Sequence, residues 1–169
     1  MKRVLLILAS VAGGIVVAAC GSDPPSSGVT PSQLALLQKQ ADMYQIDQIE
    51  VTWHRAASTH DIGLMMTIWA DNATFQVGST AARGLAQIQS VWEQAAPFQT
   101  KNVWVDETPA YKARITVSGN TGTLYFECHF VDVATGKVAA LAATQADVAR
   151  IGGRWLITSS IGSTPTLSP

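Results

Sequence analysis

The chain has 169 residues, only 14% of them charged, and a formal net charge of −1 at pH 7. Loss of residues 1–19 would remove two basic side chains and leave nine basic against twelve acidic ones, a net charge of −3. Because a nucleic-acid-binding surface needs a clustered basic face, we expect no nucleic-acid partner. The length that remains suits one domain with a hydrophobic core.

The N-terminus is typical of a targeting segment. Lys2 and Arg3 precede an apolar run over residues 4–17, which is shorter than the roughly 20 residues of a membrane-spanning helix. The residues after it, Val17-Ala18-Ala19-Cys20-Gly21, resemble the bacterial lipobox. This resemblance implies cleavage before Cys20 and attachment of lipid, with palmitate among the acyl chains, to that residue. We therefore predict a signal peptide at 1–19 and an extracytoplasmic protein of the cell envelope, anchored to the membrane through Cys20.

The rest of the chain divides into three parts. Residues 20–31 are rich in Pro, Ser and Gly and are predicted to be a flexible tether. A single domain is predicted at 32–163, followed by a short tail at 164–169. Cys128 is the only other cysteine, so no disulfide within the chain is expected. The three histidines fall on separate predicted elements, so we predict neither a metal site nor a cofactor.

Three helices are predicted in the first half of the domain. Apolar residues recur at helical spacing over 32–58, with Ser32 as the expected N-cap. Asp61 is expected to cap a second, short helix that extends to Trp69. A strand at 74–77 and a loop at 78–84 lead to the third helix, which begins at Leu85 and ends near Pro97.

The second half of the domain is predicted to be β-structure. Five strands are expected, at 101–106, 110–118, 122–133, 138–150 and 154–162. The last three turns, at Gly119-Asn120, Thr135-Gly136-Lys137 and Gly152-Gly153, are short enough for antiparallel hairpins. The order of elements predicts an α+β fold in which three N-terminal helices pack on a curved antiparallel sheet.

Four motifs in this order resemble the SnoaL-like branch of the NTF2-like superfamily. They are His60-Asp61-Ile62, Trp69-Ala70-Asp71-Asn72-Ala73-Thr74-Phe75, Arg83-Gly84-Leu85-Ala86-Gln87-Ile88 and the final segment 147–157. The resemblance covers about residues 34–162 and implies a cone-shaped fold with an apolar pocket between sheet and helices. The family includes cyclases, isomerases, dehydratases and domains that only bind or dimerise, so the fold does not define the function.

The catalytic residues of the isomerase branch are only partly matched. The position of its tyrosine falls at Trp53, and the position of its base falls at Val77, which cannot take a proton. The late-strand acid matches Asp147. In the dehydratase branch the first-helix aspartate matches Ser58, and no histidine stands at 102–103. Whether the chain is an enzyme therefore stays open at this point.

The strand at 123–133 alternates between two sets of side chains. In the first interpretation, Tyr125, Glu127 and His129 face the pocket and meet Gln145 and Asp147 from the next strand. Glu127, His129 and Asp147 would then be catalytic, with Tyr125 and Gln145 in the pocket wall. In the second interpretation these residues lie on a solvated sheet face, and the core contains Leu124, Phe126, Cys128 and Phe130.

The first interpretation also predicts a homodimer. It leaves the apolar set, with Cys128 in it, on the outer face of the sheet, where a second copy would cover it. Trp53, Trp69, Val77 and Trp92 are expected in the pocket wall. His54 and Arg55 are expected on the surface, and His60 at a helix junction.

Two functions are compatible with these sequence features. The first is a tethered domain that binds a small apolar ligand or an envelope partner in a conical pocket. The second is a SnoaL-like enzyme, a cyclase, isomerase or dehydratase, that acts on an apolar carbonyl compound by acid–base catalysis.

Overall fold

The computed structural model describes residues 28–99, 104–106, 110 and 112–163. The predicted signal peptide, Cys20, most of the tether and the C-terminal tail lie outside the described residues. The helical elements are α1 (Pro31–Thr59), α2 (Ile62–Met66), α3 (Leu85–Gln94) and the 3₁₀ helix η1 (Ala96–Phe98). The strands are β1 (Trp69–Val77), β2 (Thr80–Arg83), β3 (Trp104–Asp106), β4 (Lys112–Ser118), β5 (Thr121–Asp132), β6 (Lys137–Ile151) and β7 (Arg154–Ser163). Within these described residues, no helix is long and apolar enough to cross a membrane.

Local capping fixes both ends of α1. Thr30 accepts a hydrogen bond from the Gln33 backbone N–H, and the Gln33 side chain accepts from the Thr30 N–H, which is a complete capping box. The expected N-cap at Ser32 is therefore wrong by two residues, because Pro31 is well suited to the first helical position. His60 ends the helix in the left-handed region at φ 56°, as expected of a helix junction. Asp61 caps α2 as predicted and accepts from Leu64 N–H at 2.8 Å.

The strands form one sheet in the order β2-β1-β7-β6-β5-β3, and β4 also pairs with β5. Every pair is antiparallel except β1 with β7. Two sequence expectations fail here. The loop at 78–84 contains β2, whose four residues show no apolar alternation, and β1 begins at Trp69, which was expected on the second helix.

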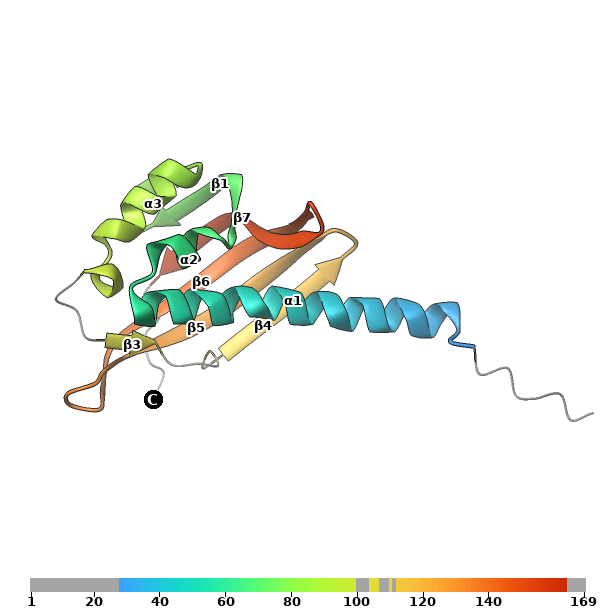
Figure 1. Ribbon diagram of the computed structural model, residues 1–169, viewed down its shortest axis with the longest axis horizontal. Coiled ribbons are helices and arrows are strands. Elements are labelled where there is room, and N and C mark those ends of the chain that lie inside the picture. The colour runs from blue at the N-terminus through green and yellow to red at the C-terminus, as the bar shows by residue number, and fades with distance from the viewer. Residues whose placement is uncertain (1–27, 100–103, 107–109, 111, 164–169) are drawn as a thin grey trace, which may run out of the picture.

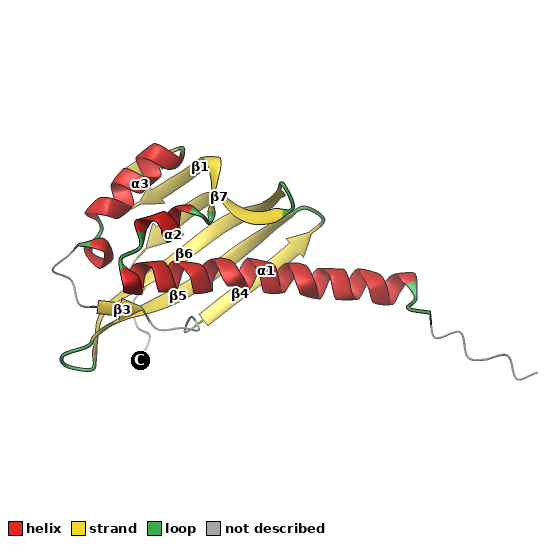
Figure 2. Ribbon diagram, in the orientation of Figure 1, coloured by secondary structure: helices red, strands yellow, loops and turns green. Residues whose placement is uncertain are grey.

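The helices cover one face of the sheet, here called the inner face (Figure 1). In Figure 2, α1 runs across β4, β5 and β6, while α3 lies beside β1. The core lies between these layers and is dominated by Trp53 of α1, Trp92 of α3, and Phe126 and Leu124 of β5. The predicted α+β cone with three N-terminal helices is confirmed.

The first third of α1 extends beyond the sheet (Figure 1). All residues from Pro31 to Ala41 are exposed, and burial against the sheet begins at Asp42 and Ile46. Leu34, Leu36 and Leu37 are 63%, 56% and 54% exposed. This part of α1 therefore presents leucines that the domain itself does not cover.

Candidate functional site

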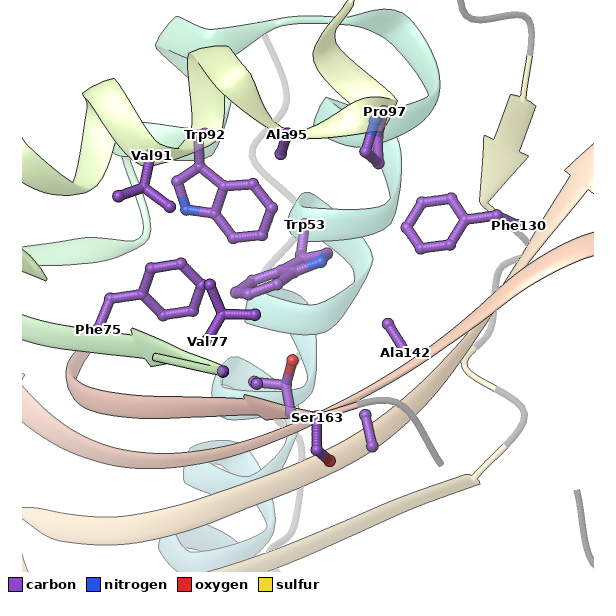
Figure 3. A pocket seen from close by; sticks show the side chains of 14 residues that line it. Trp53, Phe75, Val77, Val91, Trp92, Ala95, Pro97, Phe130, Ala142 and Ser163 are labelled. Carbon is purple, nitrogen blue, oxygen red and sulfur yellow. The ribbon is translucent and has the colours of Figure 1, made fainter. Parts of the chain in front are cut away.

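A cavity of about 510 Å³ lies between the helices α1, α3 and η1 and the strands β1, β5, β6 and β7. Figure 3 shows side chains from both the helices and the sheet around it. Its wall is apolar on nearly every side. The lining residues are Trp53, Phe75, Val77, Gly78, Val91, Trp92, Ala95, Pro97, Phe130, Ala142, Ala143, Thr144, Gly162 and Ser163.

Aromatic contacts hold the wall in place. Trp53 meets Trp92 edge-on, with ring centroids 4.7 Å apart, and meets Phe126 edge-on at 5.2 Å. Phe75 stacks on Trp92 at 5.2 Å. These are the separations and angles at which aromatic pairs attract one another. The three rings from α1, α3 and β1 therefore form a preformed apolar surface.

The cavity contains few polar groups and no ionisable side chain among its described lining residues. Thr144 and Ser163 contribute hydroxyl groups. The indole Nε1 of Trp92 is buried and has no hydrogen-bond partner in the described structure. Because this nitrogen is also buried from the cavity space, the polar groups that the wall offers to a ligand are the two hydroxyl groups. Acid–base catalysis needs a titratable group within hydrogen-bonding reach of the substrate, and this wall offers none.

Of the aromatic and aliphatic residues that the sequence predicts for the pocket, some line the cavity and one lies behind its wall. Trp53, Val77 and Trp92 lie in the cavity wall, although Val77 is 40% exposed at its rim. Trp69 lies behind the wall, with its ring 6.0 Å from that of Trp53. Val77, at the position of the isomerase branch's base, thus contributes only apolar surface.

Tyr125, Glu127 and His129 do not face the cavity, so the first interpretation of β5 is wrong. They are half-buried on the outer face of the sheet, the face turned away from the helices. Tyr125 pairs with Gln145 across β6, as expected, but Gln145 and Asp147 are exposed on that same outer face. The alternation on β5 is that of an antiparallel strand with one solvated side.

The second interpretation of β5 is confirmed by burial. Leu124, Phe126 and Cys128 are 0%, 0% and 1% exposed, and Phe130 is 7% exposed. The apolar stripe that was expected to form a dimer interface therefore packs against α1. Dimerisation through the outer face stays a prediction, but the apolar residues from which it was inferred do not lie on that face.

The outer-face residues form a polar network of their own. Tyr125 Oη donates to Glu127, and Lys112 Nζ lies 3.3 Å from Glu127 Oε1. The hydrogen bond from Tyr125, together with Lys112, lowers the pKa of Glu127. The same hydrogen bond raises the pKa of Tyr125, whose ring carries the Arg114 guanidinium at 4.3 Å. Asp147 accepts from Ser159 Oγ at 2.8 Å. These contacts stabilise the sheet surface and lie outside the cavity.

A buried polar cluster between α1 and β5 was not predicted from the sequence. His54, expected on the surface, is 0% exposed, and its Nε2 lies 2.9 Å from Cys128 Sγ. Its Nδ1 contacts the Glu50 carboxylate, which is 1% exposed. The i, i+4 spacing of Glu50 and His54 puts both on one helix face, and this is the signal that was available in the sequence.

Asp42 anchors α1 to the sheet at the point along the helix where burial begins. Its carboxylate accepts from the Arg150 guanidinium, from Trp155 Nε1 at 3.3 Å and from Gln38 Nε2 at 3.0 Å. Arg150 also lies over the Trp155 ring, 5.2 Å from its centroid. Asp42 is 4% exposed, and all three donors share its Oδ1.

Comparison with known proteins agrees with this architecture. The model of the SnoaL-like domain matches residues 38–161, so the chain belongs to the SnoaL-like domain family. No curated protein sequence matches the chain. Among solved structures, a protein of unknown function with a cystatin-like fold from Nostoc punctiforme is 15% identical, with a TM-score of 0.66 over 76% of this chain and 95% of that one.

Two further solved structures carry the NTF2-like name. A protein of unknown function from Pseudomonas putida is 17% identical, with a TM-score of 0.64 over 75% of this chain and 88% of that one. A candidate dehydratase from Streptomyces avermitilis is 13% identical, with a TM-score of 0.61 over 76% of this chain and 99% of that one. Identities this low establish the shared fold alone.

Proposed function

We propose that this protein is a membrane-tethered SnoaL-like lipoprotein whose domain binds a small, neutral, apolar molecule in the conical cavity. The observation that carries the proposal is the cavity wall. It offers aromatic and aliphatic surface on several elements and only two hydroxyl groups. Sites of this size with few polar groups suit compact apolar ligands.

The charge of the wall argues for binding rather than acid–base turnover. None of the described lining residues titrates near neutral pH. An anionic or cationic ligand would lose its hydration without gaining an ionic partner, which is strongly unfavourable. A neutral ring system fits the aromatic walls.

Equilibrium binding of N-phenyl-1-naphthylamine, a neutral apolar dye, tests the proposal. The dye should bind the wild-type domain and gain fluorescence. Ala142 lies in the cavity wall, whereas Ala139 on the same strand is exposed. We expect Ala142→Phe to weaken binding at least about tenfold, because the new ring takes up ligand volume. Ala139→Phe, the matched control, should bind as wild type does. Equal affinities of the two variants would contradict the proposal.

The membrane anchor is supported by the position of the exposed leucines. The ten residues between Cys20 and Pro31 span at most about 35 Å, so the start of α1 must stay near a lipidated Cys20. Leu34, Leu36 and Leu37 are more than half exposed at this end. Apolar side chains at a lipid surface gain free energy by leaving water. Contact of these leucines with the bilayer would therefore add to anchoring by the lipid on Cys20.

Metabolic labelling with an alkyne analogue of palmitate tests the anchor. The wild-type chain should incorporate the label and fractionate with membranes. Cys20→Ser should lose both properties, whereas Cys128→Ser should keep them, because Cys128 is buried in the core. Label that depends on Cys128, or membrane retention of Cys20→Ser, would show that the anchor is misassigned.

A further inference from the structure

Glu50, His54 and Cys128 form a chain of three functional groups inside the domain. The Glu50 carboxylate contacts His54 Nδ1, and His54 Nε2 lies 2.9 Å from Cys128 Sγ. All three residues are at most 1% exposed. Glu50 also accepts a long hydrogen bond from Ala110 N–H, at 3.5 Å. A buried polar cluster stabilises a core little or no better than apolar side chains of the same volume, so stability alone does not explain this cluster.

The order of the groups is that of an activated nucleophile. The contact of Nδ1 with Glu50 is not aligned as a hydrogen bond, but a carboxylate is an acceptor only, so its position beside Nδ1 favours the tautomer with the proton on that nitrogen. This tautomer leaves the lone pair of Nε2 facing the thiol. Nε2 is then placed to take the thiol proton. Nucleophile, base and orienting carboxylate within hydrogen-bonding reach of one another are the general signature of covalent catalysis.

The sulfur lies one layer of side chains behind the cavity wall. Cys128 shares the inner face of β5 with Phe130, which lines the cavity, and pairs across β6 with Ala142, which also lines it. His54 directly follows Trp53, a third wall residue. Phe130 in Figure 3 stands at the edge of the cavity, between the wall and η1. Because Phe130 is the cavity-lining residue next to Cys128 on this face of β5, we expect a ligand to reach the thiol past its side chain.

We propose that Cys128, with His54 as base and Glu50 as positioning residue, forms a thioether with α,β-unsaturated carbonyl compounds bound in the cavity. This inference rests on the proposed ligand site and names a class of ligand for it. The thiol proton moves to His54 Nε2 as the S–C bond forms at the β-carbon. The electrons of the C=C bond pass to the carbonyl as an enolate, and the proton on His54 then returns to the α-carbon. Nothing leaves, and no oxidant or reductant is needed.

Chalcone, an apolar diaryl enone, and dihydrochalcone, its saturated analogue, provide the test. The full-length Cys20→Ser chain is used because Cys128 is then its only cysteine. Chalcone should lose its enone absorbance and add one molecule of mass to Cys128, whereas dihydrochalcone should only displace the naphthylamine dye. We expect Glu50→Gln to slow adduct formation at least about tenfold while leaving dye affinity unchanged. Phe130→Ala should speed it, because the route to the sulfur opens.

The outcomes separate this inference from the proposed function. If both chalcones displace the dye and no adduct forms, the cavity binds ligands and the nucleophile assignment is wrong. The nucleophile assignment is also wrong if Glu50→Gln reacts as fast as the parent chain, or if Cys128→Ala still gains mass. If neither compound nor the dye binds, the proposed ligand site fails. Adduct formation that Ala142→Phe leaves unchanged, relative to Ala139→Phe, would show that the thiol is reached by another route and would overturn the proposal.

Discussion

Trp53 is the side chain on which the cavity wall depends most, so its truncation has a calculable cost. The residue is 5% exposed, and its ring lies 4.7 to 6.0 Å from the rings of Trp69, Trp92 and Phe126. Trp53→Ala therefore loses the transfer free energy of a buried indole and three aromatic contacts. We expect a loss of about 3–5 kcal/mol in the free energy of unfolding. For a domain of this size the melting temperature should fall by roughly 6–20 °C.

Urea denaturation followed by circular dichroism measures this loss, and the same helix offers a control. Tyr44 is an aromatic residue of α1 that is 65% exposed. Tyr44→Ala should change the free energy of unfolding by less than about 0.5 kcal/mol. A cost below about 1.5 kcal/mol for Trp53→Ala, or equal costs for the two variants, would refute the view that Trp53 organises the wall.

Two other changes have outcomes that the structure specifies. Asp42→Ala should cost about 2–3 kcal/mol in urea unfolding, because it leaves Arg150 and the Trp155 indole N–H without their shared acceptor; a change below about 0.5 kcal/mol would contradict this. Tyr125→Phe should raise the pKa of Glu127 toward its ordinary value in an NMR titration, because the hydrogen bond from Tyr125 is the largest cause that lowers it. A group with a lowered folded-state pKa stabilises the fold above its unfolded pKa and loses this effect as the pH falls through the folded pKa. The stability that Glu127 contributes at neutral pH, and therefore the part that is lost on acidification, should be smaller in Tyr125→Phe than in the wild type, and an unchanged pKa would show that the hydrogen bond is unimportant.

Most of the fold could be predicted because most elements carry a local signal. Asp61 marks a helix start and the glycine turns mark the hairpins, whereas the start of α1 at Thr30 and Pro31 was placed two residues late, at Ser32. The strand β2 gave no such signal, since Thr80–Arg83 is short and lacks apolar alternation. Its place is fixed by pairing with β1, which is a tertiary contact that local pattern does not contain.

The candidate site could be predicted only in part, for a physical reason. Alternation on β5 divides the strand into two faces but does not state which face meets the helices. Burial decides this, and it places Phe126 and Cys128 inside and Glu127 outside. His54 was misplaced because a titratable residue is usually exposed unless a partner stabilises it. Here the partners are Glu50, one turn earlier, and Cys128, 74 residues away. The second contact is visible only after folding.

The central claim, that the aromatic cavity binds a neutral apolar molecule, is tested most directly by the indole N–H resonances in a ¹H–¹⁵N titration with N-phenyl-1-naphthylamine. Trp53 and Trp92 line the cavity, whereas Trp155 donates its indole N–H to Asp42 away from it. We predict saturable shifts of the Trp53 and Trp92 signals, and a Trp155 signal that stays in place. Shifts of Trp155 alone, or no shift of Trp53 and Trp92 at saturating dye, would contradict the account.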